Sequence, residues 1–206
     1  MSGWILSSGG NEFSAAYLEA DLAALAKRKN LNSELLVVVT APFPTQLLAY
    51  QTAEKYFAKA GIKTIMSPIL SEADLTIDNV TQLARADAIY FAGGTPSRLT
   101  KCFVDTTADT ALRTALTNGA VLMGSSAGAM LFGTKVVMPG GTEIGKGLNL
   151  LENQIVLAHF GGIWPAWSTQ FQNQGFGLLG LAEGSSLLTS VTAETGPIEF
   201  GPVSRN

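Results

Sequence analysis

Residues 120–130 read Ala-Val-Leu-Met-Gly-Ser-Ser-Ala-Gly-Ala-Met and carry the strongest structural signal in the chain. The apolar residues 120–123 predict a buried strand, and the small and apolar residues after Ser126 predict a helix that begins there. Gly124, Ser126 and Gly128 fit the G-x-S-x-G pattern of a nucleophile elbow, a sharp turn from strand to helix. Bulky neighbours would collide in such a turn, so the small residues around Ser126 have a steric reason.

An elbow of this kind presents the Ser126 hydroxyl above the edge of a sheet. It also places the N–H of Ala127 at a helix N-terminus, where it can donate to an oxyanion. The same residues fit a simpler structure, in which Ser125 and Ser126 only cap the helix. The pattern predicts Ser126 as a nucleophile, with a plain helix cap as the alternative.

Outward from the elbow, apolar strands alternate with amphipathic helices. Further strands are expected at residues 4–7, 35–40, 62–66, 88–91 and 155–158. Helices are expected at residues 15–27, 46–60 and 79–85, the last one capped by Asp78. This order predicts parallel pairing with right-handed crossovers. We expect an α/β fold, a three-layer α/β/α sandwich with a mostly parallel sheet, and a Gly-rich hairpin or loop at 136–147. Residues 1–206 are expected to form a single domain.

The composition excludes several classes of protein. Only 14% of the 206 residues are charged and 47% are hydrophobic, which excludes disorder for most of the chain. No run of about 18 apolar residues occurs, so we expect no membrane span. The start, MSGWILSSGGNEF, does not resemble a secretory signal, and we expect a cytoplasmic protein. A net charge of −3 with scattered cations argues against nucleic acid. The low charge is compatible with a monomer or a homodimer.

The chain contains one cysteine and one histidine. Cys102 therefore has no disulfide partner within the chain, and a tetrahedral Cys/His zinc site is excluded, so we expect no metal and no cofactor. A serine hydroxyl needs a base to act as a nucleophile. If the mechanism is of the Ser/His type, that base must be His159, which ends the expected strand 155–158. A histidine satisfied by a backbone partner is the alternative.

The imidazole in turn needs an acid that fixes its tautomer. Glu183 is the best candidate because it is an isolated charge in an apolar, Gly-rich stretch at the end of an expected strand. Glu152 precedes the strand that leads to His159, so it should lie at the opposite edge of the sheet and is the weaker candidate. A surface role for Glu183 is the alternative.

Two glycine turns follow expected strands. The turn at residues 8–10 (Ser-Gly-Gly) predicts a close approach of the backbone to another group. In residues 91–99, FAGGTPSRL, Gly93 or Gly94 is a candidate second oxyanion donor, and Pro96 fits the first position of a helix. A tight turn without a ligand also explains this segment. Arg98 could bind a substrate carboxylate through its planar guanidinium, or it could simply lie on a solvated helix face.

Five segments in this order resemble peptidase family S51, which holds the α-aspartyl dipeptidases (peptidase E) and the cyanophycinases. They are GGTPSRL (93–99), GSSAGAM (124–130), GLNLL (147–151), HF (159–160) and GLAEGSSLL (180–188). The order Ser, His, acid differs from the Ser, acid, His order of α/β-hydrolases. The resemblance implies a class I glutamine amidotransferase-like fold, Ser126 as nucleophile, His159 as base and Glu183 as the triad acid. It also implies oxyanion donors from Gly94 and Ala127.

Two features of the chain depart from that family. The family's GGGNT-like turn is here AGGTP. The aspartyl dipeptidases carry an Asp further along the chain from the nucleophile, where the nearby acid here is Glu143. We therefore include Glu143 among candidate substrate-binding residues, together with Thr95, Arg98 and Trp164. Trp164 and its aromatic neighbours could line a cleft or an interface, or serve only packing.

The expected function is a serine peptidase that hydrolyses short peptides, with Asp-X dipeptides as one candidate class. Two alternatives remain open. One is a cyanophycinase-like or other acyl hydrolase of the same fold, and the other is a catalytically silent binding module. A small peptide is the expected partner.

Overall fold

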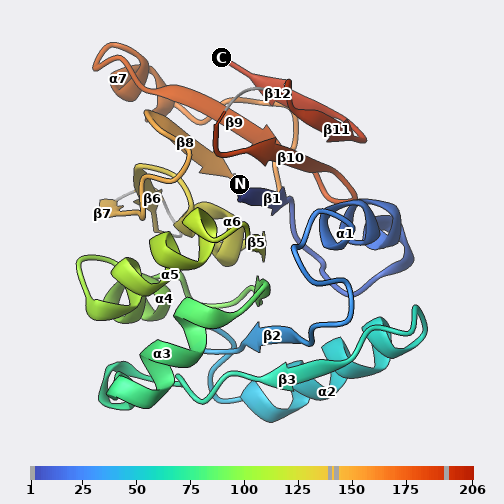
Figure 1. Ribbon diagram of the computed structural model, residues 1–206. Coiled ribbons are helices and arrows are strands. Elements are labelled where there is room, and N and C mark those ends of the chain that lie inside the picture. Colours follow the sequence, from blue (N-terminus) through green and yellow to red (C-terminus); the bar gives the residue numbers. More distant parts are fainter. Residues whose placement is uncertain (1–2, 139–140, 142–143, 193–194) are drawn as a thin grey trace.

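The computed structural model describes residues 3–138, 141, 144–192 and 195–206. It shows a mixed α/β fold whose central sheet has seven strands in the order β11-β10-β1-β5-β4-β2-β3 (Figure 1). The strands are β1 (Trp4–Ser8), β2 (Leu35–Val38), β3 (Thr64–Met66), β4 (Ala88–Phe91), β5 (Val121–Ser125), β10 (Ser186–Ser190) and β11 (Ile198–Phe200). The pairs among β1 to β5 are parallel, and β10 and β11 extend one edge as antiparallel strands.

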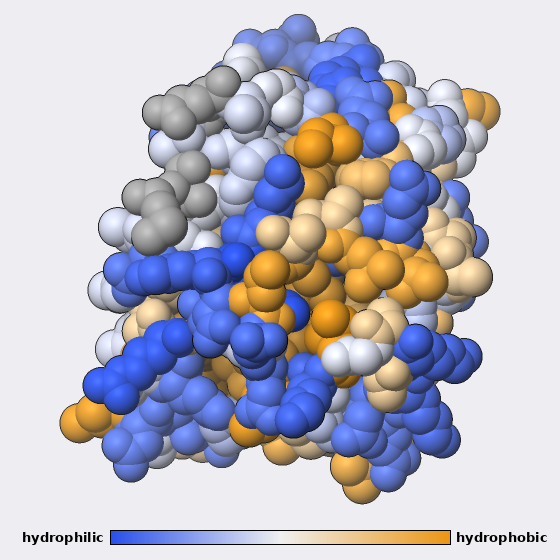
Figure 2. All heavy atoms as spheres, turned by 45° about the vertical axis from the view of Figure 1, so that its right-hand side comes forward, coloured by the Kyte–Doolittle hydropathy of each residue, from blue (hydrophilic) through white to orange (hydrophobic). Residues whose placement is uncertain are grey.

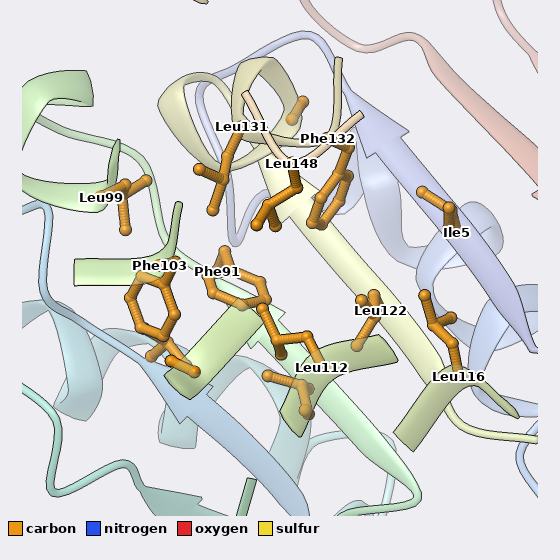
Figure 3. Packing of buried hydrophobic residues seen from close by; sticks show 14 of the residues in the cluster. Ile5, Phe91, Leu99, Phe103, Leu112, Leu116, Leu122, Leu131, Phe132 and Leu148 are labelled. Atoms are coloured by element: carbon orange, nitrogen blue, oxygen red, sulfur yellow. The ribbon is translucent and has the colours of Figure 1, made fainter. Parts of the chain in front are cut away.

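Helices cover both faces of this sheet. They are α1 (Leu18–Leu25), α2 (Gln46–Ala58), α3 (Ile77–Arg85), α4 (Pro96–Phe103), α5 (Thr107–Thr117) and α6 (Ala127–Leu131). Val37 and Tyr90 pack among residues of α1 and α2, whereas Leu36, Ile89 and Leu122 pack among residues of α3 to α6. Figure 3 shows Leu122 among the residues of this second cluster. Because successive side chains of a strand point to opposite faces, strands buried on both faces are apolar throughout.

The expected α/β fold with a mostly parallel central sheet is confirmed, and a second sheet adds to the single sheet that we expected. Its order is β12 (Val203–Arg205), β9 (Gly177–Leu181), β8 (Gln154–Leu157), β6 (Lys135–Val137) and β7 (Ile144–Lys146). Val156 and Leu179 join the core beside α3 to α6. Ile155 and Leu178 pack on the other side with Phe171 of α7 (Ser168–Gln172). Part of the expected helical layer is therefore a sheet, because an apolar run predicts a buried strand without saying which sheet it joins.

Local signals are mostly confirmed, with shifts at the ends of elements. The expected helix 15–27 begins as a 3-10 turn at Ala15–Tyr17 and continues as α1. Helix α3 is capped by Thr76, whose hydroxyl accepts from the Asn79 N–H at 3.3 Å, and not by Asp78, which lies in its first turn. Either side chain suits an N-cap, and the backbone turns extended at Thr76. The hairpin expected in 136–147 is formed by β6 and β7.

The surface carries apolar side chains as well as charged ones. Figure 2 shows apolar residues gathered over the middle of one face, with hydrophilic residues around them. The most exposed large apolar residues are Leu31, Phe43, Leu47, Leu48, Ile77 and Ile163. Within the described residues, no helix combines the length and hydrophobicity needed to cross a bilayer.

Candidate active site

Ser126 lies in the turn between β5 and α6, with φ 51° and ψ −117°. Such a conformation is strained for a residue other than glycine. A Cβ atom on Gly124 would lie 2.6 Å from the carbonyl of Gly128, and one on Gly128 would lie 2.2 Å from the Phe91 carbonyl oxygen. Real Cβ contacts are never this short, so both positions require glycine. The steric reason inferred for the small residues of the elbow is confirmed.

The structure brings Ser126, His159 and Glu183 together in one chain of hydrogen bonds. The Ser126 Oγ and the His159 Nε2 are 2.9 Å apart, and the His159 Nδ1 and the Glu183 Oε1 are 3.0 Å apart. An ionised carboxylate only accepts, so Nδ1–H donates to Glu183 and Nε2 is left to accept from the serine hydroxyl. This tautomer is the one that can take the serine proton.

His159 and Glu183 both lie at strand ends of the second sheet. His159 follows β8 and Glu183 follows β9, the parallel neighbour of β8. Glu152 lies before β8, at the other end of that strand. The side chains of His159 and Glu183 are 49% and 59% exposed, so the site is open to solvent. With a neutral imidazole this contact is a hydrogen bond, and its main effect is to orient the ring.

The turn after β1 supports His159. A Cβ atom on Gly10, whose φ is 129°, would lie 2.1 Å from the His159 Cε1. A Cβ atom on Gly9 would lie 1.9 Å from the Ala182 carbonyl oxygen. The His159 N–H donates to the Gly9 carbonyl at 2.7 Å. The close approach predicted for this turn is confirmed, and its partners are the imidazole and the segment before Glu183.

The backbone around Ser126 offers N–H donors for an oxyanion. Among the described residues, the N–H groups of Ala127 and Gly94 have no acceptor. The point where a Cβ would stand on Gly93 is 3.1 Å from the Ser126 Cβ, so the glycine turn lies against Ser126. The Gly93 N–H, however, donates to the Glu12 Oε1 at 2.9 Å. Of the paired glycines, Gly94 is therefore the one with a free N–H.

Sequence reasoning missed Tyr17, which ties two loops of the site together. The buried Tyr17 hydroxyl donates to the Gly10 carbonyl and accepts from the Gly184 N–H at 2.6 Å. It thus links the residue that faces His159 with the residue after Glu183. Burial is the main cause that raises the pKa of Tyr17, with a smaller contribution from the charge of Glu183. The phenol stays protonated and keeps donating.

The remaining candidate residues occupy varied positions. Thr95 is exposed at the start of α4, and its N–H donates to the Ala41 carbonyl at 3.1 Å. The Arg98 guanidinium donates to the carbonyls of Thr40 and Leu70 and lies 4.5 Å over the Phe43 ring.

Trp164 packs against Phe160, next to His159, with ring centroids 4.4 Å apart and the rings tilted by 38°. Glu143 lies outside the described residues. Cys102 is buried, and burial raises its pKa to about 11. In the part of the chain that the structure describes, no three His, Cys, Asp or Glu side chains are grouped to hold a metal ion.

Comparisons with known proteins agree with this architecture. The model of peptidase family S51 matches residues 4–190. A peptidase from an acI-B1 Actinobacterium has a similar structure, with a TM-score of 0.77 and 19% identity over 99% of this chain and 97% of that one. A peptidase E-type protein from Listeria monocytogenes EGD-e gives a TM-score of 0.68 and 16% identity, over 97% of this chain and 98% of that one. No curated protein matches the chain.

Proposed function

The chain belongs to peptidase family S51, and on that premise we propose that it is a serine peptidase which hydrolyses short peptides through Ser126, His159 and Glu183. One observation carries the proposal. The strained Ser126 directs its hydroxyl at His159 Nε2, 2.9 Å away, while Glu183 holds the opposite ring nitrogen at 3.0 Å. This geometry lets the imidazole take the serine proton as the oxygen attacks.

In the first half of the reaction, Ser126 Oγ attacks the scissile carbonyl carbon while His159 Nε2 takes its proton. The carbonyl oxygen becomes an oxyanion, which the N–H groups of Ala127 and Gly94 stabilise. His159 then gives the proton to the leaving amine, the C–N bond breaks and an acyl-serine remains. In the second half, His159 removes a proton from water, the hydroxide attacks the acyl group, and Ser126 is released with its proton restored.

Replacement of the nucleophile is the direct test. We expect Ser126→Ala to lower kcat by roughly 10⁶-fold, because the reaction then lacks its covalent route. A fluorophosphonate should label Ser126 in the wild type and leave Ser126→Ala unlabelled. Ser97→Ala is a matched control, since Ser97 lies on α4 outside the triad. Full activity in Ser126→Ala would overturn the proposal.

A substrate panel separates the remaining possibilities. Asp-X dipeptides, longer peptides and p-nitrophenyl esters all offer a carbonyl that Ser126 could attack. They differ in the groups on either side of that carbonyl, which the substrate pocket must hold. Cleavage of Asp-X dipeptides alone would assign the aspartyl dipeptidase activity, whereas cleavage of other peptides or esters would assign a different acyl hydrolase. Absence of both turnover and fluorophosphonate labelling would favour a silent binding module.

A further inference from the structure

Glu12 stands beside the proposed nucleophile, although it belongs to the loop after β1. Its Oε1 accepts from the Gly93 N–H at 2.9 Å. The point where a Cβ would stand on Gly93 lies 3.1 Å from each carboxylate oxygen of Glu12 and 3.1 Å from the Ser126 Cβ. Each oxygen is therefore at most twice that distance from Ser126 Cβ. A carboxylate is thus part of the wall around the reacting serine.

The loop is built to hold Glu12 there. Gly10, Asn11 and Phe13 all have positive φ, at 129°, 58° and 61°. On one side Gly10 lies against the His159 ring. On the other side the Phe13 ring packs against three aromatic rings with centroid distances of 5.8, 6.1 and 5.1 Å; these belong to Tyr56, Phe57 and Tyr90. Glu12, half-buried between two anchored neighbours, has little freedom to leave the site.

The position of the carboxylate fits one group of a peptide. The scissile carbonyl carbon must come within about 3 to 3.5 Å of the Ser126 Oγ. The α-nitrogen of the same residue is two bonds away, about 2.5 Å from that carbon. The α-nitrogen of the bound substrate therefore lies at a distance from Ser126 similar to that of the Glu12 carboxylate. The cationic end of a lysine or arginine side chain is several bonds further out.

Glu12 also has the capacity to bind an ammonium group. Within the described part of the chain, its Oε2 has no hydrogen-bond partner. A carboxylate accepts at about four lone-pair sites, so it can bind N–H₃⁺ while Gly93 keeps its bond. Hydrogen bonds between two charged groups are about twice as strong as neutral ones.

We propose that Glu12 determines substrate choice by binding the α-ammonium group of an N-terminal residue, so that the enzyme releases single residues from free N-termini. The inference rests on the proposed function of Ser126. The inference also predicts why substrates with a free N-terminus react faster than those with a blocked one. An unpaired carboxylate near the developing oxyanion opposes its charge, whereas a bound ammonium neutralises that carboxylate. A peptide with a blocked N-terminus loses both the binding contact and this neutralisation.

The test compares matched substrates on matched variants. The substrates are alanine p-nitroanilide and its N-acetylated form, which share the scissile bond and differ in the ammonium group. The variants are Glu12→Gln, which keeps the shape of the side chain, and Glu19→Gln, which removes one charge from the exposed surface of α1. We expect wild type and Glu19→Gln to prefer the free amine. Glu12→Gln should lose about 10- to 100-fold in kcat/KM on the free amine. On the acetylated form it should lose nothing, because the unpaired carboxylate that opposes the oxyanion is gone.

Each other result counts against the inference. Equal losses on both substrates would mean that Glu12 only supports the Gly93 turn, and equal cleavage of both by the wild type would remove the ammonium from recognition. Urea unfolding shows whether Glu12→Gln is folded.

Calorimetric titration of Ser126→Ala and of the Ser126→Ala, Glu12→Gln double variant with Ala-Ala and N-acetyl-Ala-Ala measures the preference without turnover. If neither anilide is cleaved, lack of a Glu12-dependent preference in this titration overturns the inference. Activity that survives Ser126→Ala would instead overturn the proposed function.

Discussion

Gly10→Ala tests whether the turn after β1 sets the position of His159. The new Cβ would lie 2.1 Å from the His159 Cε1, 2.5 Å from Nε2 and 2.6 Å from Nδ1. Carbon atoms pack at about 3.5 to 4.0 Å, so the ring must move by roughly 1.5 Å. Such a shift breaks a 2.9 Å hydrogen bond to Ser126. A misplacement of about 1 Å costs around 100-fold in rate, and we expect kcat/KM to fall by at least that factor.

Two control variants separate this displacement from backbone strain. Gly175 has φ 86° and open space around it, so Gly175→Ala carries strain without a clash. Gly161 lies two residues after His159 with open space and no positive φ, so Gly161→Ala should change little. The strained positions should each lose about 1 to 3 kcal/mol of unfolding free energy, measured in urea. Only Gly10→Ala should also lose peptidase activity and slow fluorophosphonate labelling of Ser126. Wild-type activity in Gly10→Ala, or an equal loss in Gly175→Ala, would refute the reasoning.

Two further predictions concern buried hydroxyl and carboxyl groups. Tyr17→Phe leaves the Gly10 carbonyl and the Gly184 N–H unpaired, and should cost about 1 to 3 kcal/mol in urea unfolding and lower kcat; an unchanged kcat would contradict a positioning role. Burial raises the pKa of Asp21 to about 7, so the folded protein retains a proton that the unfolded chain loses near pH 4. Stability should therefore fall as pH rises from about 4 to 7, by up to about 1.4 kcal/mol per pH unit. Asp21→Asn should remove that dependence when unfolding is compared at pH 5 and pH 8, and an equal slope in the variant would contradict it.

Much of the candidate site could be inferred from the sequence, because it depends on residues close together in the chain or on how many residues of a type the chain contains. The elbow requires small residues within a few positions of Ser126, and a short stretch of sequence shows them. The chain has one histidine, so His159 is the single candidate for a Ser/His-type base. Glu183 stood out as an isolated charge at a strand end, and the structure places it 3.0 Å from the ring.

Other residues of the site are not indicated by any short sequence pattern. Glu12 meets Gly93, and Tyr17 meets Gly184, across long separations in the chain. A single glutamate in a loop or a tyrosine at a helix start has no spacing that distinguishes it from surface or core residues. Their roles arise from contacts between loops, which periodicity does not encode.

Local stereochemistry and composition were sufficient for the alternating strands and helices, the strained serine and His159 as the single candidate base. Packing of distant segments determined the rest: the placement of β8 and β9 in a second sheet, the close fit of Gly10 against His159, and the carboxylate of Glu12 beside Ser126. The physical reason is that turns and helix starts depend on neighbouring residues. Sheet membership and loop contacts depend on burial and hydrogen bonds, which form only when the whole chain is folded.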